Sequence, residues 1–280
     1  MNILVTGASG YVGRSFIQSY QNRHHFSTFS NQSMQLEDLD LHGTDAIVHA
    51  AALVHQKEPL PDEAYHQANV LYPLELAKRA KANGVKQFIF ISSIAIYGES
   101  YHKITAQSIP APTTPYGKSK LQAELALQAL EDKSFNVVII RPPMIYGAQA
   151  PGNIHALTRL IQKVPILPFG GIKNRRSFLY IGNLTAFIEH TLSTQSSGSF
   201  LIADDEAVST TYLIQSLARV MNRPCWLFRP PLFERLLKRL RPKIHSRLYE
   251  DLTVDTSKTK EQLQFHPPYS FDRAILKSFS

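Results

Sequence analysis

The sequence is poor in cysteine, in long apolar runs and, near its start, in acidic side chains. Cys225 is the single cysteine among 280 residues, so no disulfide can form within the chain. A reducing compartment, the cytoplasm, is therefore expected. No apolar run approaches the ~18 residues that a membrane-spanning helix needs, and a strand-like run beginning at residue 2 leaves no room for a signal peptide. We expect a cytoplasmic protein without a transmembrane segment.

Positive charge is in excess, with a formal net charge of +8. The stretch Pro231 to Arg241 places apolar side chains at helical spacing opposite basic ones. Such a helix can lie on an anionic membrane, but we favour packing of its apolar face against the rest of the protein. The basic residues lack interleaved aromatic side chains, so nucleic acid is not an expected partner. Histidines such as His155 and His190 lack metal-ligand spacing, so no metal site is expected.

Strand-like and helical stretches alternate along the chain. Strands are predicted at 2–6, 25–30, 45–50, 87–92, 136–141 and 199–203, and helices at 11–22, 63–83 and 115–132. This alternation predicts an α/β fold, a Rossmann-like doubly wound parallel sheet with helices on both faces. The polar segment before Thr44 is too short for the usual third strand and its helix, so we expect that part of the sheet to be abbreviated.

Three glycines follow the first strand at the spacing Gly7-x-x-Gly10-x-x-Gly13. Glycines between a strand and a helix let the chain turn sharply. They also let backbone N–H groups approach a pyrophosphate at the helix N-terminus, where the dipole favours anions. The spacing differs from Gly-x-Gly-x-x-Gly, but its context indicates a dinucleotide-binding loop.

Tyr116 and Lys120 lie four residues apart in an expected helix and so share one face. Thr114 suits the N-cap and Pro115 the first helical position. A free phenol has a pKa of about 10. A nearby ammonium favours the phenolate, so we expect Lys120 to bring the pKa of Tyr116 toward neutral, as acid–base catalysis requires.

Ser92 and Ser93 end the apolar strand that runs from Phe88 to Ile91. Ligands in open α/β sheets bind at the carboxyl ends of the strands. A serine hydroxyl at this place can hydrogen-bond a substrate oxygen, or it can simply cap the strand.

Together these motifs resemble an extended short-chain dehydrogenase/reductase of the NAD-dependent epimerase/dehydratase family, which works on nucleotide-sugars. The matching stretches run nearly end to end. They are the glycine motif, Asp45 to Ala51, Asn69, Ser92-Ser93 with Tyr97-Gly98, the Tyr116/Lys120 pair, Arg141-Pro142 with Tyr146-Gly147, Asn174 to Ile181, and Asp255 to Lys258.

The resemblance implies a role for individual residues. It gives Ser93, Tyr116 and Lys120 as catalytic serine, acid/base and ribose-binding lysine. Arg176 is implied as the grip on the substrate diphosphate, which suits its planar fork. The implied substrate contacts are Ser93, Met144, Asn153, Arg176 and Arg247. The implied cofactor contacts are Gly7, Ser9, Gly10, Tyr11, Val12, Gly13, Arg14, Ser30, Asn31, His49, Ala50, Ala51, Asn69, Tyr116, Lys120 and Pro143.

Two departures from the family's pattern matter. Met144 stands where the family often has a substrate-contacting Asn. An acid about 20 residues after the glycine motif normally selects NAD, yet no acidic residue occurs between Met1 and Gln35. Without that carboxylate nothing repels a 2′-phosphate, and Arg14 adds positive charge. The cofactor is therefore predicted to be NAD(P), with a preference for NADP(H).

The resemblance implies an NAD(P)-dependent oxidoreductase that acts at C4 of a nucleotide-sugar of the UDP-hexose type. We predict a UDP-4-keto-sugar reductase of surface polysaccharide biosynthesis. A UDP-sugar 4-epimerase, similar to UDP-glucose 4-epimerase, is one alternative. A non-catalytic dinucleotide-binding sensor or interaction protein is an alternative of another class. A 4,6-dehydratase is disfavoured, because no Asp-Glu pair follows Ser93.

Two domains are expected. Residues 1–147 with about 176–204 are predicted to form the dinucleotide-binding domain, and about 148–175 with 205–280 a smaller substrate-binding lobe. A homodimer through the helices at 63–83 and 115–132 is implied by the resemblance alone.

Overall fold

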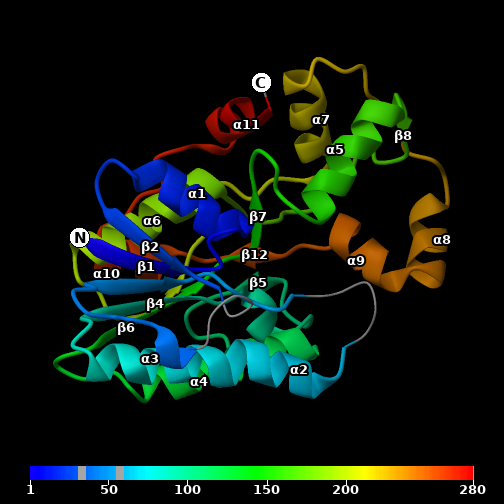
Figure 1. Ribbon diagram of the computed structural model, residues 1–280. Coiled ribbons are helices and arrows are strands. Elements are labelled where there is room, and N and C mark those ends of the chain that lie inside the picture. Colours follow the sequence, from blue (N-terminus) through cyan, green and yellow to red (C-terminus); the bar gives the residue numbers. More distant parts are fainter. Residues whose placement is uncertain (31–35, 55–59, 280) are drawn as a thin grey trace.

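The computed structural model of the chain describes residues 1–30, 36–54 and 60–279. Its principal strands are β1 (Asn2–Thr6), β2 (His25–Phe29), β3 (Ala46–His49), β4 (Gln87–Ile91), β6 (Asn136–Arg141) and β10 (Gly198–Leu201). They form one parallel sheet in the order β2–β1–β3–β4–β6–β10 (Figure 1). The predicted doubly wound α/β fold is confirmed, with a strand at each predicted position.

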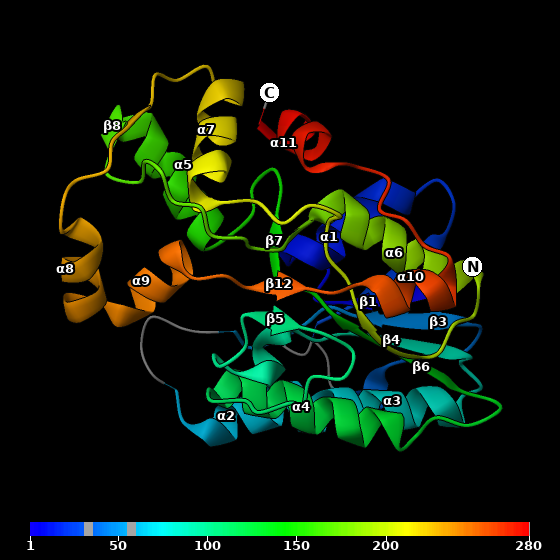
Figure 2. The same ribbon diagram turned by 180° about the vertical axis from the view of Figure 1, so that it is seen from behind.

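Helices cover both faces of this sheet (Figures 1 and 2). Successive residues of a strand point to opposite faces. Ile3 and Val5 share a core with α1 (Tyr11–Tyr20) and α6 (Ile181–Ser193). Leu4 lies in the opposite core, together with residues of α3 (Tyr72–Ala82) and α4 (Pro115–Gln128). The central strand β4 is buried along its whole length, as its apolar sequence predicted.

The sheet is short on the side of β2. Among the described residues no strand lies beyond β2, and a single 3-10 turn, Leu36–Asp38, precedes β3. The expected abbreviation is confirmed for this part of the chain.

The remaining elements gather mainly beyond the carboxyl ends of the strands (Figure 1). They include three short pairs of parallel strands: β7 (Met144–Tyr146) with β9 (Phe178–Tyr180), β5 (Lys103–Ile104) with β12 (Thr253–Val254), and β8 (Ile166–Leu167) with β11 (Trp226–Leu227). The helices there are α5 (Asn153–Lys163), α7 (Thr210–Val220), α8 (Phe233–Leu240) and α9 (Pro242–Tyr249).

The last two helices, α10 (Ser257–Leu263) and α11 (Phe271–Phe279), return toward the sheet. Thr259 Oγ1 donates to the carbonyl of Leu201 in β10, and His190 of α6 bonds the carbonyl of Leu263. Residues after 257 therefore pack partly on β10 and α6 of the sheet-containing part. The domain boundaries given above stay a prediction.

Helix α8 forms where predicted, but only part of its apolar face packs: Phe233 and Leu237 are half-buried. Leu232, which precedes it, and its own Leu236 and Leu240 are 70%, 55% and 64% exposed, and no residue of α8 is buried. The interpretation that we favoured, packing of this face on the rest of the predicted substrate lobe, holds for Phe233 and Leu237 but is wrong for Leu232, Leu236 and Leu240. The helix packs mainly on the short α9, which covers too little of it. Within the described ranges, no helix is both long and apolar enough to cross a membrane.

Candidate active site

The loop between β1 and α1 is shaped by its glycines. Gly7 has a φ of +71°, and a Cβ on it would lie 2.6 Å from Ala51 N. A Cβ on Gly13 would lie 2.5 Å from the carbonyl oxygen of Gly7. Helix α1 then begins after Gly10 without a side-chain cap. A helix N-terminus of this kind presents backbone N–H groups to an anion. The structure thus gathers Gly7, Ser9, Gly10, Tyr11, Val12, Gly13, Ala50 and Ala51 around one turn.

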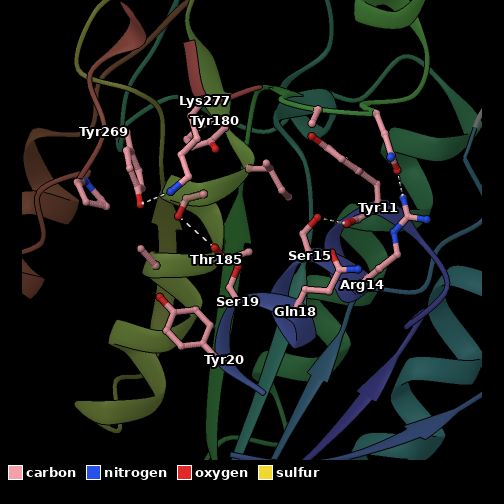
Figure 3. Close-up of a pocket in the computed structure, with 16 residues that line it drawn as sticks. Tyr11, Arg14, Ser15, Gln18, Ser19, Tyr20, Tyr180, Thr185, Tyr269 and Lys277 are labelled. Carbon is pink, nitrogen blue, oxygen red and sulfur yellow. Dashed lines mark hydrogen bonds between the residues drawn. The ribbon is translucent and has the colours of Figure 1, made fainter. Parts of the chain in front are cut away.

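The side chains of Arg14 and Tyr11 point away from the glycine turn, into a separate cavity. Both line a cavity of about 860 Å³ between α1, α6 and the C-terminal segment (Figure 3). Arg14 Nη2 donates to Gln149 Oε1 over 3.3 Å, so its guanidinium is engaged with the loop after β7. Ser30 directly follows β2, and Asn31 lies outside the described residues. A contact from Arg14 to a 2′-phosphate stays a prediction.

Helix α4 begins as its sequence predicts. Thr114 Oγ1 accepts a hydrogen bond from Gly117 N at 3.1 Å, and Pro115 is the first helical residue. A Cβ on Gly117 would lie 2.5 Å from the carbonyl oxygen of Ala95. Glycine therefore lets α4 approach the turn after β4 closely, and this approach brings Tyr116 to that turn.

Ser93 occupies the end of β4 and meets Tyr116 there. Its hydroxyl hydrogen-bonds the Tyr116 phenol. Ser93 Oγ also accepts from Ala95 N at 3.1 Å, and so caps the short 3-10 helix Ile94–Tyr97. The capping role that we considered for a serine at this strand end thus belongs to Ser93, and its contact with a substrate oxygen stays a prediction.

Ser92 turns the other way, into a buried ion-pair network. Its hydroxyl donates to Glu124, whose side chain has 0% exposure. Arg141 binds the same carboxylate through Nε and through Nη2, the latter at 2.6 Å, and donates from Nη1 to the Tyr97 hydroxyl at 2.9 Å. The sequence analysis included Arg141 and Tyr97 but missed Glu124. One signal was present: Glu124 lies one turn after Lys120 on the same helix.

Lys120 is a buried cation without a bonded partner. Its residue is 1% exposed, and Nζ lies 4.0 Å from the ring centroid of Phe90. No hydrogen-bond acceptor for Nζ is found in the described part of the chain. Burial lowers the pKa of Lys120 to about 7, and the field of Glu124 opposes this shift. A buried donor without an acceptor is costly, so Nζ suits a ligand hydroxyl.

The expectation that Lys120 lowers the pKa of Tyr116 is wrong for the protein by itself. Burial raises the pKa of Tyr116 to about 12, and the hydrogen bond with Ser93 opposes this shift. Desolvation disfavours the charged form of both side chains. The phenol is therefore protonated at neutral pH, and the ammonium that was expected to act on it is itself weakened.

His49 belongs to the core. Its ring has no exposed surface, its Nδ1 lies 2.8 Å from Thr6 Oγ1, and Phe88 and Phe90 stack against it. Burial and the field of Lys120 lower the pKa of His49 to about 3. The imidazole is therefore neutral and enclosed, and the structure leaves no exposed part of His49 for the predicted cofactor contact.

Asn69 joins two parts of the site. It lies in a π-helical turn, Gln67–Leu71, between α2 (Asp62–His66) and α3. Its Nδ2 donates to the Leu53 carbonyl at 2.9 Å and to Ser119 Oγ at 3.0 Å, and its Oδ1 accepts from Leu53 N at 2.8 Å. Asn69 thus ties the segment after β3 to α4. Turns of this type are frequent at functional sites.

Four of the five predicted substrate contacts, all but Ser93, come together at one cavity. Met144, Asn153, Arg176 and Arg247 all line one cavity of about 270 Å³. Its other walls are mainly apolar, formed among others by Ile154, Leu157, Phe169, Phe178, Leu213 and Ile244. Met144 adds an apolar wall where an amide would hydrogen-bond. Pro143 is buried just before β7.

Arg176 and Arg247 place two cations at this cavity. Arg176 Nη1 donates to the carbonyls of Ser246 and Glu250, at 3.2 and 2.9 Å. Burial and the field of Arg247 lower the pKa of Arg176. Both arginines also line a second cavity, of about 160 Å³, that reaches residues 98–102, just after the Ser93 turn. Two adjacent guanidinium groups suit a doubly charged group such as a diphosphate.

Comparisons with known proteins agree with this arrangement. The model of the NAD dependent epimerase/dehydratase family matches residues 3–203. UDP-glucose 4-epimerase of Vibrio cholerae is 36% identical over 98% of this chain and 93% of its own length. The crystal structure of UDP-glucuronic acid 4-epimerase from Bacillus cereus in complex with NAD has a TM-score of 0.78 at 21% identity, covering 100% of this chain and 97% of that one. The structure of RMD from Pseudomonas aeruginosa complexed with NADPH has a TM-score of 0.79 at 21% identity and covers 100% and 98%.

The family match extends over more than two thirds of the chain and includes Ser93, Tyr116 and Lys120. The family match and the similarity to UDP-sugar 4-epimerases show an enzyme of the oxidoreductase or isomerase type, so the non-catalytic sensor is set aside. The chain belongs to the NAD-dependent epimerase/dehydratase family, within the extended short-chain dehydrogenases/reductases.

Proposed function

We propose that the protein is a nucleotide-sugar 4-epimerase that interconverts UDP-hexoses at C4. The observation that carries this proposal is the nearness in the chain of two groups of side chains. Ser93 and Tyr116 are hydrogen-bonded at the end of β4, and the cavity that Arg176 and Arg247 line reaches residues 98–102, just after the turn that Ser93 begins. The similarity to UDP-glucose 4-epimerase of Vibrio cholerae supports the same function. This differs from our first interpretation, a 4-ketoreductase.

The cofactor is a nicotinamide dinucleotide, as in the rest of the family. The chemistry that it supplies when bound is hydride exchange with C4 of the hexose. Lys120 fits such a group, because its buried Nζ lacks an acceptor and a ribose offers hydroxyl oxygens. The glycine turn after β1 would hold the pyrophosphate on backbone N–H groups. These roles rest on the donors present in the chain.

Tyr116 would move the proton in each half of the reaction. It takes the proton of the 4-hydroxyl as C4 is oxidised, and returns it to the oxygen after the keto-sugar has turned over in the cleft. Ser93 donates to the same oxygen and holds it. Lys120, charged when it faces acceptor oxygens, favours the phenolate form of Tyr116. The arginine pair keeps the diphosphate fixed while the sugar turns.

The test is interconversion of UDP-glucose and UDP-galactose, and of the corresponding N-acetylhexosamine pair, followed by proton NMR. We expect interconversion without added cofactor by protein that retains NAD⁺ from purification, because an epimerase recycles its hydride. Tyr116→Phe serves as the inactive control. If no UDP-hexose is converted by wild type with either dinucleotide added, the epimerase proposal fails.

A 4-ketoreductase is the second candidate, and one observation favours it. No acidic residue occurs between Met1 and Gln35, so the end of β2 lacks the carboxylate that selects NAD. We therefore propose that NADP(H) binds at least as tightly as NAD(H). A reductase would release oxidised cofactor after each turnover. Protein purified without cofactor, which consumes NADPH with a UDP-4-keto-sugar and interconverts no UDP-hexose, would establish this candidate over the first.

Assembly as a homodimer is a further part of this proposal. Helices α3 and α4 lie side by side on one face of the sheet, and Leu71 and Leu125 are 40% and 60% exposed there. Sedimentation equilibrium of the purified protein measures the mass directly. A monomer at micromolar concentration would contradict the dimer.

A further inference from the structure

One side of the apolar face of α8 remains exposed, although Phe233 and Leu237 on the same face are half-buried. Leu232, Leu236 and Leu240 follow one another along one side of the helix. Their exposed fractions are 70%, 55% and 64%. Isolated exposed leucines are ordinary, but a contiguous row on one helix marks an interaction surface.

Neighbouring elements extend this surface. Trp226 of β11 is 74% exposed, Phe228 just after it is 49% exposed, and Ile244 of α9 is 46% exposed. In both views α8 lies at the end of the molecule farthest from the six-stranded sheet (Figures 1 and 2). We call residues 226–244 the basic apolar surface.

Charge identifies the partner of the basic apolar surface. Residues 226–244 contain six basic side chains and one acidic one, Glu234. All six are exposed: Arg229, Arg235, Lys238, Arg239, Arg241 and Lys243. Two copies of so positive a surface would repel each other, which disfavours self-association. A partner must therefore be negatively charged and also accept leucine and tryptophan side chains.

We propose that the basic apolar surface docks on an anionic lipid bilayer. The leucine row of α8 would enter the boundary between head groups and acyl chains, as in other interfacial helices. Trp226 suits the same depth, because indole is enriched at that boundary. The long Lys and Arg side chains reach outward to lipid phosphates while their stems lie along the apolar layer. An acidic protein would satisfy the charges without requiring the exposed leucine row.

The position of α9 gives this docking a consequence for the enzyme. Ile244 belongs to the basic apolar surface and also lines the cavity that Arg176 and Arg247 face. The substrate cavity therefore opens beside the docked surface. Docking does not depend on the proposed reaction, and it can be measured without turnover.

The experiment is co-sedimentation of the full-length protein with vesicles. Vesicles of phosphatidylcholine alone are compared with vesicles containing about one third phosphatidylglycerol, at low and high salt. We expect binding to the anionic vesicles alone, weakened steeply by salt because screening shortens the range of charge attraction. Equal binding to both kinds of vesicle, or no binding to anionic vesicles at low salt, would overturn the proposal.

Matched variants separate the two contributions. The triple variant Leu232→Ser, Leu236→Ser, Leu240→Ser should lower the partition coefficient by about tenfold or more. Arg235→Gln with Lys238→Gln and Arg239→Gln should lower it by at least as much at low salt. The control changes Ile109→Ser and Leu276→Ser, which are 74% and 54% exposed elsewhere, and should bind as wild type does.

Folding and self-association are checked on the same samples. Because the substituted side chains are exposed, the variants should keep the circular dichroism spectrum and the UDP affinity of wild type. If the leucine variant binds anionic vesicles as well as wild type does, the proposal is wrong. It is also wrong if that variant instead changes the mass of the protein in the absence of vesicles, because the surface is then a contact between copies.

Discussion

Two arginines near the cleft, Arg141 and Arg176, differ in how their charge is balanced. Arg141 forks onto the buried carboxylate of Glu124, with Nη2 at 2.6 Å. Burial alone would lower the pKa of Arg141, but bonding to Glu124 outweighs it and raises the pKa. Arg176 bonds carbonyl oxygens, and burial and the neighbouring Arg247 lower its pKa. No carboxylate in the described residues lies within ion-pair distance of Arg176.

The difference separates a structural cation from a binding cation. The charge of an arginine that pairs with a carboxylate inside the fold is already balanced, so such an arginine does not attract a charged ligand. It instead holds together the two elements on which the ion pair lies. An arginine held on carbonyls and facing a second cation is balanced only in part, for Arg176 by the more distant carboxylates of Glu250 and Asp251. The fold tolerates this arrangement because the two guanidinium groups border cavities that a ligand and solvent can enter. Arg141 is thus expected to affect stability, and Arg176 to affect binding.

The largest expected effect is on stability, through Glu124→Ala. Removing this carboxylate leaves Arg141 buried without its counter-charge, which typically costs about 3–5 kcal/mol. Urea unfolding of the variant measures the loss, with the exposed Glu75→Ala as control. Replacing both partners, Glu124→Met with Arg141→Met, should recover part of the stability, because no uncompensated charge remains. A loss below about 1 kcal/mol in Glu124→Ala would show that the pair is not structural.

This network also shows where the sequence was informative and where it was not. The strands and α4 were predictable, because apolar runs, the Thr114 cap and Pro115 act locally. The rule that sites form at strand ends pointed to Ser92 and Ser93, and the family resemblance joined Ser93 with Tyr116. Glu124 was missed because its partner Arg141 is 17 residues away and on another element. A single acid in a helix gives no local sign of burial.

Environment, too, could not be read from spacing. The Tyr116/Lys120 interval predicted a shared face, but the depth at which that face lies depends on how α4 packs on β4. Burial raises the pKa of Tyr116 to about 12 and lowers that of Lys120 to about 7. The shift of Tyr116 is opposite to the one that a neighbouring ammonium alone would cause. In the same way, the amphipathic pattern of α8 predicted a helix but not what its apolar face would contact.

The next effect is on turnover, through Tyr116→Phe. Loss of a general acid–base group lowers the rate by about 10²-fold or more, while cofactor affinity should be unchanged, since Lys120 and the glycine turn remain. Steady-state kinetics and cofactor titration measure the two. Tyr212→Phe is the control, because it removes a hydroxyl of α7 that is bonded to Asp272 of α11. Near-normal turnover in Tyr116→Phe would exclude the proposed mechanism.

Arg176→Ala tests the binding role that we expect for Arg176. Charge-assisted hydrogen bonds contribute roughly 1.5–3 kcal/mol, so UDP should bind about tenfold to a hundredfold more weakly. Arg176→Lys should recover part of the affinity, because an ammonium cannot match the fork. Calorimetry with UDP gives both values, and the exposed Arg175→Ala is the matched control. Stability should fall less than in Glu124→Ala. Unchanged UDP affinity in Arg176→Ala would remove this arginine from the diphosphate site.

The smallest expected effect concerns a position where charge is missing altogether. Ser30 follows β2, whose Phe29 is paired in register with Thr6, so Ser30 and Gly7 leave the sheet next to each other. A carboxylate at this place hydrogen-bonds a free ribose 2′-hydroxyl and repels a 2′-phosphate. Ser30→Asp should therefore shift the affinity ratio of NAD(H) to NADP(H) by about tenfold toward NAD(H), or about 1.4 kcal/mol.

Fluorescence titration of both reduced cofactors measures that ratio in wild type and variant. Ser27→Asp adds the same charge to an exposed position of β2 and should leave the ratio unchanged, because Ser27 lies three residues before Ser30, within the strand. Wild type should bind NADPH at least as tightly as NADH. A wild-type preference of tenfold or more for NADH would mean that the missing carboxylate does not decide the choice. The cofactor would then be selected by other groups near the ribose, and the case for a reductase would lose its one supporting observation.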